Sequence, residues 1–93
     1  MHVAALQGHT SVVRQLITAG ADVNKVSTRF GDVPLHTAAA SGYVDVVELL
    51  IKAGADVNKS LRNGLRPLDL ALLHRHADVA QMLRSAGATS SGV

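Results

Sequence analysis

A block of six residues occurs twice in this chain of 93 residues, and this repetition constrains the fold more than any other feature. Gly-Ala-Asp-Val-Asn-Lys stands at 20–25 and again at 54–59, which is 34 residues further on. The apolar pattern Val-Val-x-x-Leu-Ile precedes both copies, at 12–17 and at 46–51. A fixed period of this length indicates stacked structural units, each of which buries its apolar face against its neighbours.

A third, weaker copy follows. The Pro-Leu pair at 34–35 returns at 67–68 with an offset of 33 residues, so the middle copy carries a one-residue insertion in the loop before Gly31. The copies predict a truncated first unit at 1–25, a second unit at 26–59, a third, C-terminal capping unit at 60–88 and a flexible tail at 89–93.

Each copy predicts two helices. In Val-Val-x-x-Leu-Ile the apolar side chains share one stripe of a helix. Upstream, an Ala-rich segment follows Pro34 and stops at Gly42, as in a short helix with proline in its first turn and glycine beyond its last. The alanines let two helices approach closely. The sequence therefore predicts an all-α chain of helix-turn-helix units that are joined by extended loops.

Composition excludes several classes of protein. Hydrophobic residues make up 47% of the chain and charged residues 17%, which is unlike a disordered chain. The absence of cysteine excludes disulfides, zinc-cysteine centres and thiol catalysis. A net charge of +2 is small for a dedicated nucleic-acid binder, and no apolar run approaches the ~20 residues of a membrane span. We expect a soluble, unprocessed protein in the cytoplasm or nucleus, with no membrane partner.

The residues Pro34-Leu35-His36-x-Ala38-Ala39-x-x-Gly42, followed by the Gly-Ala-Asp-Val-Asn block, closely resemble the ankyrin repeat. The resemblance covers almost the whole chain. It implies an ankyrin-repeat solenoid, in which stacked helix-turn-helix units are joined by β-hairpin-like loops. It also implies protein partners.

The chain departs from this pattern at its helix starts and at its two ends. Val33 and Arg66 stand where the family has a capping Thr, so each helix loses a cap worth ~1 kcal/mol. Asp69 replaces the motif His, and its carboxylate can accept backbone N–H bonds in the first turn. Arg84 replaces the apolar Ile51, which indicates a polar C-terminal end. Because the first unit is truncated, its exposed edge can lead to self-association.

The ionisable residues give little support for catalysis or metal binding. His74 and His76 lie two apart on a predicted helix, about 200° around its axis, so they cannot chelate one ion together. The resemblance gives His36 a structural hydrogen-bonding role. Asp22 and Asp56 shape their loops through bonds to nearby backbone N–H groups. We therefore expect no enzymatic activity, no metal and no cofactor.

The resemblance implies an adaptor or scaffold whose hairpin tips and inner helices form a concave surface that contacts a protein partner. Carried over by position, the contacts are Arg29, Phe30 and Asp32 in one hairpin, Arg62, Asn63 and Leu65 in the next, and Leu6, Gln7, Ala40, Ser41, Leu73 and His74 on the inner helices. Phe30 beside Arg29 has the composition of an interface anchor, although Phe30 can equally pack against its own loop. Basic residues in the hairpins could steer an acidic partner, although solvated loop charges are the more common explanation for such a pattern.

Leu72 and Leu73 lie in the last unit, where at least one of them should face outward. Such a side chain either contacts a partner or is covered by a helix beyond the third unit. The sequence leaves both interpretations open.

Two further functions remain as alternatives. Asn24 and Asn58 stand in a pattern that resembles the substrate of an oxygen-dependent asparaginyl hydroxylase, although the same side chains can serve only to hold their loops. Weak nucleic-acid binding through the basic hairpins is the second alternative, and its affinity would fall steeply with salt.

Overall fold

The computed structural model describes residues 10–26 and 31–89. This part of the chain forms five helices and no strand. The helices are α2 (Thr10–Thr18), α3 (Pro34–Ser41), α4 (Val44–Lys52), α5 (Pro67–Leu73) and α6 (Ala77–Ser85).

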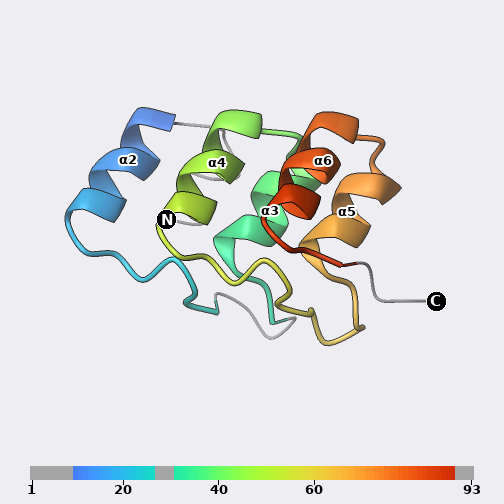
Figure 1. Cartoon of the computed structure of the whole chain (residues 1–93). Helices are drawn as coiled ribbons and strands as arrows, with labels where there is room; N and C mark the ends of the chain where they lie inside the picture. The colour runs from blue at the N-terminus through green and yellow to red at the C-terminus, as the bar shows by residue number, and fades with distance from the viewer. Residues whose placement is uncertain (1–9, 27–30, 90–93) are drawn as a thin grey trace.

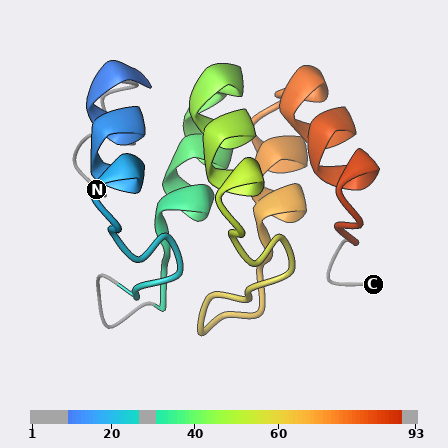
Figure 2. The same ribbon diagram turned by 60° about the vertical axis from the view of Figure 1, so that its left-hand side comes forward.

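The helices form two layers. In the first layer α2, α4 and α6 lie side by side, and in the second layer α3 and α5 lie behind them (Figures 1 and 2). Each helix of the second layer packs against the helix that follows it in the chain, and α3 also packs against α5. The loops between the helix pairs extend from one edge of the stack (Figure 2). The arrangement confirms the predicted all-α stack of helix-turn-helix units.

Small side chains set the spacing between α3 and α5. Ala38, Ala39 and Ala71 are fully buried, so the two backbones approach closely. The first layer contributes larger aliphatic side chains, and Leu50 and Leu83 are also fully buried. The core is therefore aliphatic and runs through the stack from one pair to the next.

The apolar stripe of α2 is only partly covered. Val12 is 42% exposed, whereas Val46 at the equivalent position of α4 is 1% exposed. Among the described helices, α2 ends the first layer and packs mainly against α4, while α4 lies between α2 and α6 (Figure 1). The difference in exposure between Val12 and Val46 follows from these two positions in the layer.

Helices α3 and α5 start in the same way. Neither Val33 nor Arg66 provides a side-chain cap, as predicted. The third residue of each helix bonds back to the preceding backbone instead: Nδ1 of His36 accepts the Val33 N–H at 3.0 Å, and Oδ2 of Asp69 accepts the Arg66 N–H at 2.8 Å. Each contact satisfies one N–H group that the helix itself leaves unpaired.

Residues 74–76 form a turn, which corrects the prediction that His74 and His76 share a helix. Helix α5 ends at Leu73 and α6 begins at Ala77. Between the two histidines Arg75 takes a φ of 61°, close to the 75° of Gly42 at the equivalent turn, and this left-handed conformation stops the helix. The two imidazole rings therefore stack, with centroids 6.3 Å apart, instead of facing opposite ways.

No helix in the described residues is long and apolar enough to cross a membrane.

Candidate functional site

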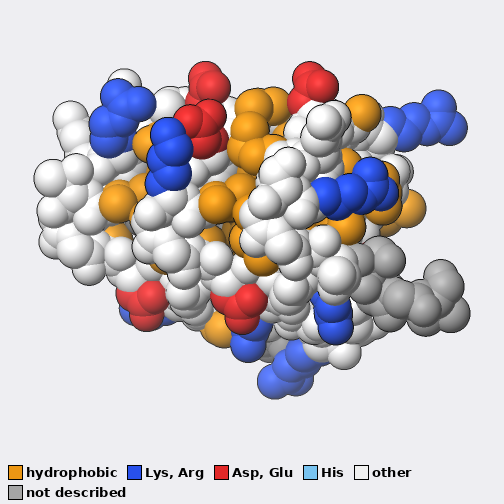
Figure 3. All heavy atoms as spheres, viewed as in Figure 1, with side chains coloured by type: hydrophobic (Ala, Val, Ile, Leu, Met, Phe, Trp, Pro, Cys, Tyr) orange, Lys and Arg blue, Asp and Glu red, His pale blue; other side chains and the backbone are white. Residues whose placement is uncertain are grey.

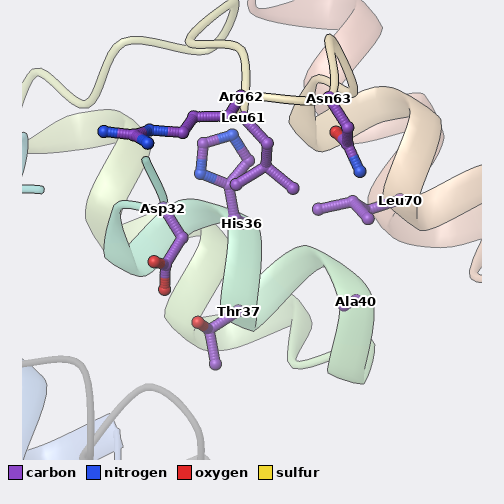
Figure 4. Close-up of a pocket in the computed structure, with 8 residues that line it drawn as sticks. All are labelled: Asp32, His36, Thr37, Ala40, Leu61, Arg62, Asn63 and Leu70. Carbon is purple, nitrogen blue, oxygen red and sulfur yellow. The ribbon is translucent and has the colours of Figure 1, made fainter. Parts of the chain in front are cut away.

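An open hollow of about 420 Å³ lies on the second-layer side of the stack, between α3, α5 and the loop that precedes α5. Its walls combine aliphatic side chains with a polar rim (Figure 4). The lining residues are Asp32, His36, Thr37, Ala40, Leu61, Arg62, Asn63 and Leu70. Volumes of this size are typical of ligand sites, but the hollow is open to solvent along one side.

A tight turn presents the loop side of the hollow. The Leu61 N–H donates to the Leu65 carbonyl at 2.8 Å, and the Gly64 N–H donates to the Leu61 carbonyl at 2.9 Å. Oδ1 of Asn63 accepts the Leu65 N–H at 3.1 Å, and Gly64 supplies the positive φ of 89°. The predicted hairpin is thus a hydrogen-bonded turn without strands, and its tip exposes Arg62 and Asn63.

The backbone and side-chain stem of Arg62 lie close to Gly31 in the preceding loop. A Cβ atom at Gly31 would lie 3.5 Å from the Arg62 nitrogen and 3.8 Å from its Cγ. In Figure 4 the Arg62 side chain extends past the His36 ring and along the edge of the hollow. The one ion pair within the described residues joins Lys52 and Glu48 on α4, so the Arg62 guanidinium has no carboxylate partner there.

His36 closes the inner wall and joins two loops. Its Nδ1 accepts the Val33 N–H, so Nε2 carries the hydrogen and donates to the Lys59 carbonyl at 2.6 Å. Burial lowers the pKa of His36 below its ordinary 6.5, since the charged ring would lose its hydration. Both ring nitrogens are engaged in structural bonds, which confirms the structural role expected for this histidine.

The structure brings four of the predicted contact residues together in the hollow: Asp32, Ala40, Arg62 and Asn63. Four others do not line it: Leu65 takes part in the turn through its backbone, Ser41 and Leu73 end their helices, and His74 follows α5. Four more lie outside the described residues: Leu6, Gln7, Arg29 and Phe30. The proposed anchor role of Phe30 stays a prediction.

Thr37, Leu61 and Leu70 line the hollow but were missed as contact residues. In Figure 4 Leu70 points from α5 toward Leu61 of the loop, across the top of α3. Thr37 and Leu70 occupy equivalent positions of successive units, 33 residues apart. That spacing could have placed both on the exposed side of the inner helices.

Asn24 and Asn58 join neighbouring units through matching contacts. Oδ1 of Asn24 accepts the Asp56 N–H at 2.7 Å and its Nδ2 donates to the Gly54 carbonyl at 3.1 Å. Oδ1 of Asn58 accepts the Thr89 N–H at 2.9 Å and its Nδ2 donates to the Gly87 carbonyl at 3.3 Å. These bonds support the structural interpretation of both asparagines, and their hydroxylation stays a prediction.

The aspartates of the two Asn-containing loops act locally, as predicted. Oδ1 of Asp22 accepts the Asn24 N–H at 2.8 Å, and Oδ1 of Asp56 accepts the Asn58 N–H at 3.0 Å. Each bond spans two residues and shapes the turn that positions the following asparagine. The described residues contain no cluster of three or more His, Asp or Glu side chains suited to a metal ion.

The charges on the first-layer face are mixed. Acidic and basic side chains are scattered over α2, α4 and α6, with hydrophobic side chains between them (Figure 3). At the end of the stack Leu72 and Leu73 are 44% and 66% exposed, which confirms the expectation that at least one of them faces outward. Arg84 is exposed as well, as expected for a polar end.

The family model for ankyrin repeats matches residues 1–91 with three copies. The chain belongs to the ankyrin-repeat family. Ankyrin repeats are generally protein-protein interaction modules, and the family is typically non-enzymatic. The comparison with curated proteins gave no match. Within this ankyrin-repeat chain the predicted unit boundaries at 25, 59 and 88 stay a prediction.

Proposed function

We propose that this chain is a non-enzymatic adaptor or scaffold module that binds a protein partner through the surface formed by α3, α5 and the loop between α4 and α5. One observation carries the proposal: Leu61 and Leu70, two half-buried aliphatic side chains of the third unit, line an open hollow together with Ala40 of the second unit, beside exposed polar groups. An apolar centre with a polar rim is the usual anatomy of a protein interface.

The openness of the hollow favours a macromolecular partner. A small molecule binds tightly when most of its surface is buried, which requires an enclosed pocket. This hollow lies between two units and continues onto the loop tip at Arg62 and Asn63. A partner that covers the loop and both inner helices would exclude water from a surface that no small ligand spans.

The test compares capture of proteins from a cell lysate by the immobilised chain and by two variants. Leu70→Glu places a charge in the hollow, and Gln81→Glu places the same charge on the exposed side of α6. We expect wild type and Gln81→Glu to retain the same proteins and Leu70→Glu to lose them, with all three showing the same helical circular dichroism.

Capture that survives Leu70→Glu in a folded chain would contradict the proposed surface. The paired change Arg29→Ala with Phe30→Ala tests the neighbouring hairpin in the same assay. A loss of capture in that variant alone would move the anchor to residues 29 and 30.

A further inference from the structure

The hollow and its loop carry chemistry that narrows the class of partner. We propose that the hollow accepts one aliphatic side chain of an extended acidic peptide segment, and that Arg62 pairs with a carboxylate next to that side chain. This inference rests on the proposed protein-binding function and specifies what the surface recognises.

The aliphatic preference follows from Leu70. The equivalent position of the preceding unit is Thr37, so the last unit has an isobutyl group where the middle unit has a hydroxyl. Leu70 and Leu61 are both half-buried and face each other over Ala40 (Figure 4). A partner's aliphatic side chain between the two leucines would remove the remaining apolar surface from water. The position that Thr37 occupies in the middle unit is thus aliphatic in the gap between α3 and α5.

The preference for a carboxylate follows from the loop. Residues 57–66 contain three cations, Lys59, Arg62 and Arg66, and no acidic residue. The Arg66 guanidinium already donates to Oγ1 of Thr89 at 2.7 Å. Arg62 has its backbone and stem beside Gly31 and no ion-pair partner in the described part of the chain, so it is available to a partner.

Asp32 is the one acidic residue in the lining of the hollow. It already has an interaction within the chain, and its charge acts on His36. A partner's carboxylate would therefore be placed at Arg62 and away from Asp32, which gives the bound segment a preferred register. Arginine suits this role because its planar guanidinium can bind a carboxylate through two parallel bonds.

The mixed chemistry favours a peptide over a nucleic acid. Nucleic-acid binding draws its affinity from many phosphate contacts and has no use for an aliphatic hollow. An extended peptide offers both required groups on neighbouring residues, since successive side chains project to opposite sides of its backbone and can reach the hollow and the loop tip separately.

The experiment selects binders to the 93-residue chain from a display library of short random peptides. We expect the enriched peptides to share Leu, Ile, Val or Met next to Asp or Glu. For one enriched peptide, fluorescence polarisation should show that Arg62→Glu weakens binding at least about tenfold, as for truncated charge pairs at interfaces. Replacing the peptide's carboxylate with Lys should then restore binding to Arg62→Glu.

Arg84→Glu provides the matched control, because it makes the same charge change on an exposed arginine of α6, away from the hollow. This variant should bind the peptide like wild type. Arg62 is an exposed loop residue, so Arg62→Glu should fold normally and circular dichroism will verify it.

Four results would overturn the inference. Enriched peptides that lack the aliphatic-acidic pair, or that bind Arg62→Glu unchanged, would leave protein binding intact but refute this recognition. Enrichment of no peptide at all would refute it as well. Salt-sensitive binding of a labelled DNA or RNA duplex, lost in Arg62→Glu, would assign the loop to nucleic acid. The lysate-capture test with Leu70→Glu examines the protein-binding surface, and its result does not depend on the peptide assays. The two proposals can therefore be distinguished.

Discussion

The side chain of Asn24 accepts the backbone N–H of Asp56 in the next unit at 2.7 Å, and Asn58 repeats this contact with Thr89 one unit later. Each asparagine also donates to a glycine carbonyl of the same neighbouring loop. The loops are thus connected between units by side-chain amides, in parallel with the apolar contacts between helices.

Removing one of these amides should destabilise the stack. We predict that Asn24→Ala and Asn58→Ala each lower the free energy of unfolding by about 1–3 kcal/mol, because two backbone groups lose their partners. Urea denaturation followed by circular dichroism measures the effect. Asn63→Ala is the control, since Asn63 makes one contact within its own turn and should cost less.

The stability of the chain should depend on the protonation of His36. Its pKa is lowered in the folded state by burial, so the unfolded chain takes up this proton first as the pH falls. The contribution of His36 is therefore complete above about pH 6.5 and is lost progressively below it. Denaturation at a series of pH values should show this decline in wild type and a smaller decline in His36→Gln. Equal pH dependence in the two proteins would contradict the structural role of the neutral ring.

Gly42 is close to His76 of the next unit. A Cβ atom at Gly42 would lie 2.5 Å from Nδ1 of His76, whose Nε2 is bonded to the Ala40 carbonyl at 3.0 Å. Gly42→Ala should therefore destabilise the chain by more than the roughly 1–2 kcal/mol of backbone strain that its positive φ causes.

Gly54 is the control position that distinguishes the effect of the His76 contact from the effect of backbone strain. Its φ is 91°, and nothing lies within 4 Å of a Cβ at this position. Gly54→Ala should thus cost the backbone strain alone. In a double-mutant cycle, His76→Ala should recover part of the loss caused by Gly42→Ala. If the losses in stability caused by Gly42→Ala and His76→Ala are additive, the imidazole ring of His76 moves away from the new methyl group without cost, which would contradict the prediction.

Arg75 is the one residue other than glycine with a positive φ in the described part of the chain. The left-handed conformation costs an L-residue about 1–2 kcal/mol, which a glycine avoids at some cost in backbone entropy. Arg75→Gly should therefore raise the free energy of unfolding by up to about 1 kcal/mol. Arg75→Ala removes the same charge but keeps the backbone strain, so it should not raise the free energy of unfolding. Thermal and urea denaturation of both variants therefore shows whether a gain in stability comes from the backbone conformation or from the loss of the charge.

The helix pairs could be predicted from the sequence because their determinants are local and repeated. Proline at 34 and 67 marks two helix starts, and the spacing of apolar residues at 46–51 marks a buried stripe. The bonds of Asp69 and His36 to the preceding backbone follow from their position in the first turn. Such contacts span three residues, so the sequence alone contains the information.

The turn at 74–76 could not be predicted in the same way. Gly42 marks the equivalent turn of the middle unit, but Arg75 occupies this position in the last unit, and an arginine gives no sign of a left-handed residue. The hollow was only partly predicted for a different reason. Leu61 and Leu70 of the third unit line the hollow together with Ala40 of the second unit because the two units approach across closely packed alanines, a distance that no single repeat encodes.

The most direct test of the account is methyl NMR of the leucine-labelled chain during titration with a peptide obtained from the display selection. We predict that the methyl signals of Leu61 and Leu70 shift together, while those of Leu83, on the buried face of α6, stay in place. Shifts confined to the exposed side of α6, with Leu61 and Leu70 unchanged, would contradict the account.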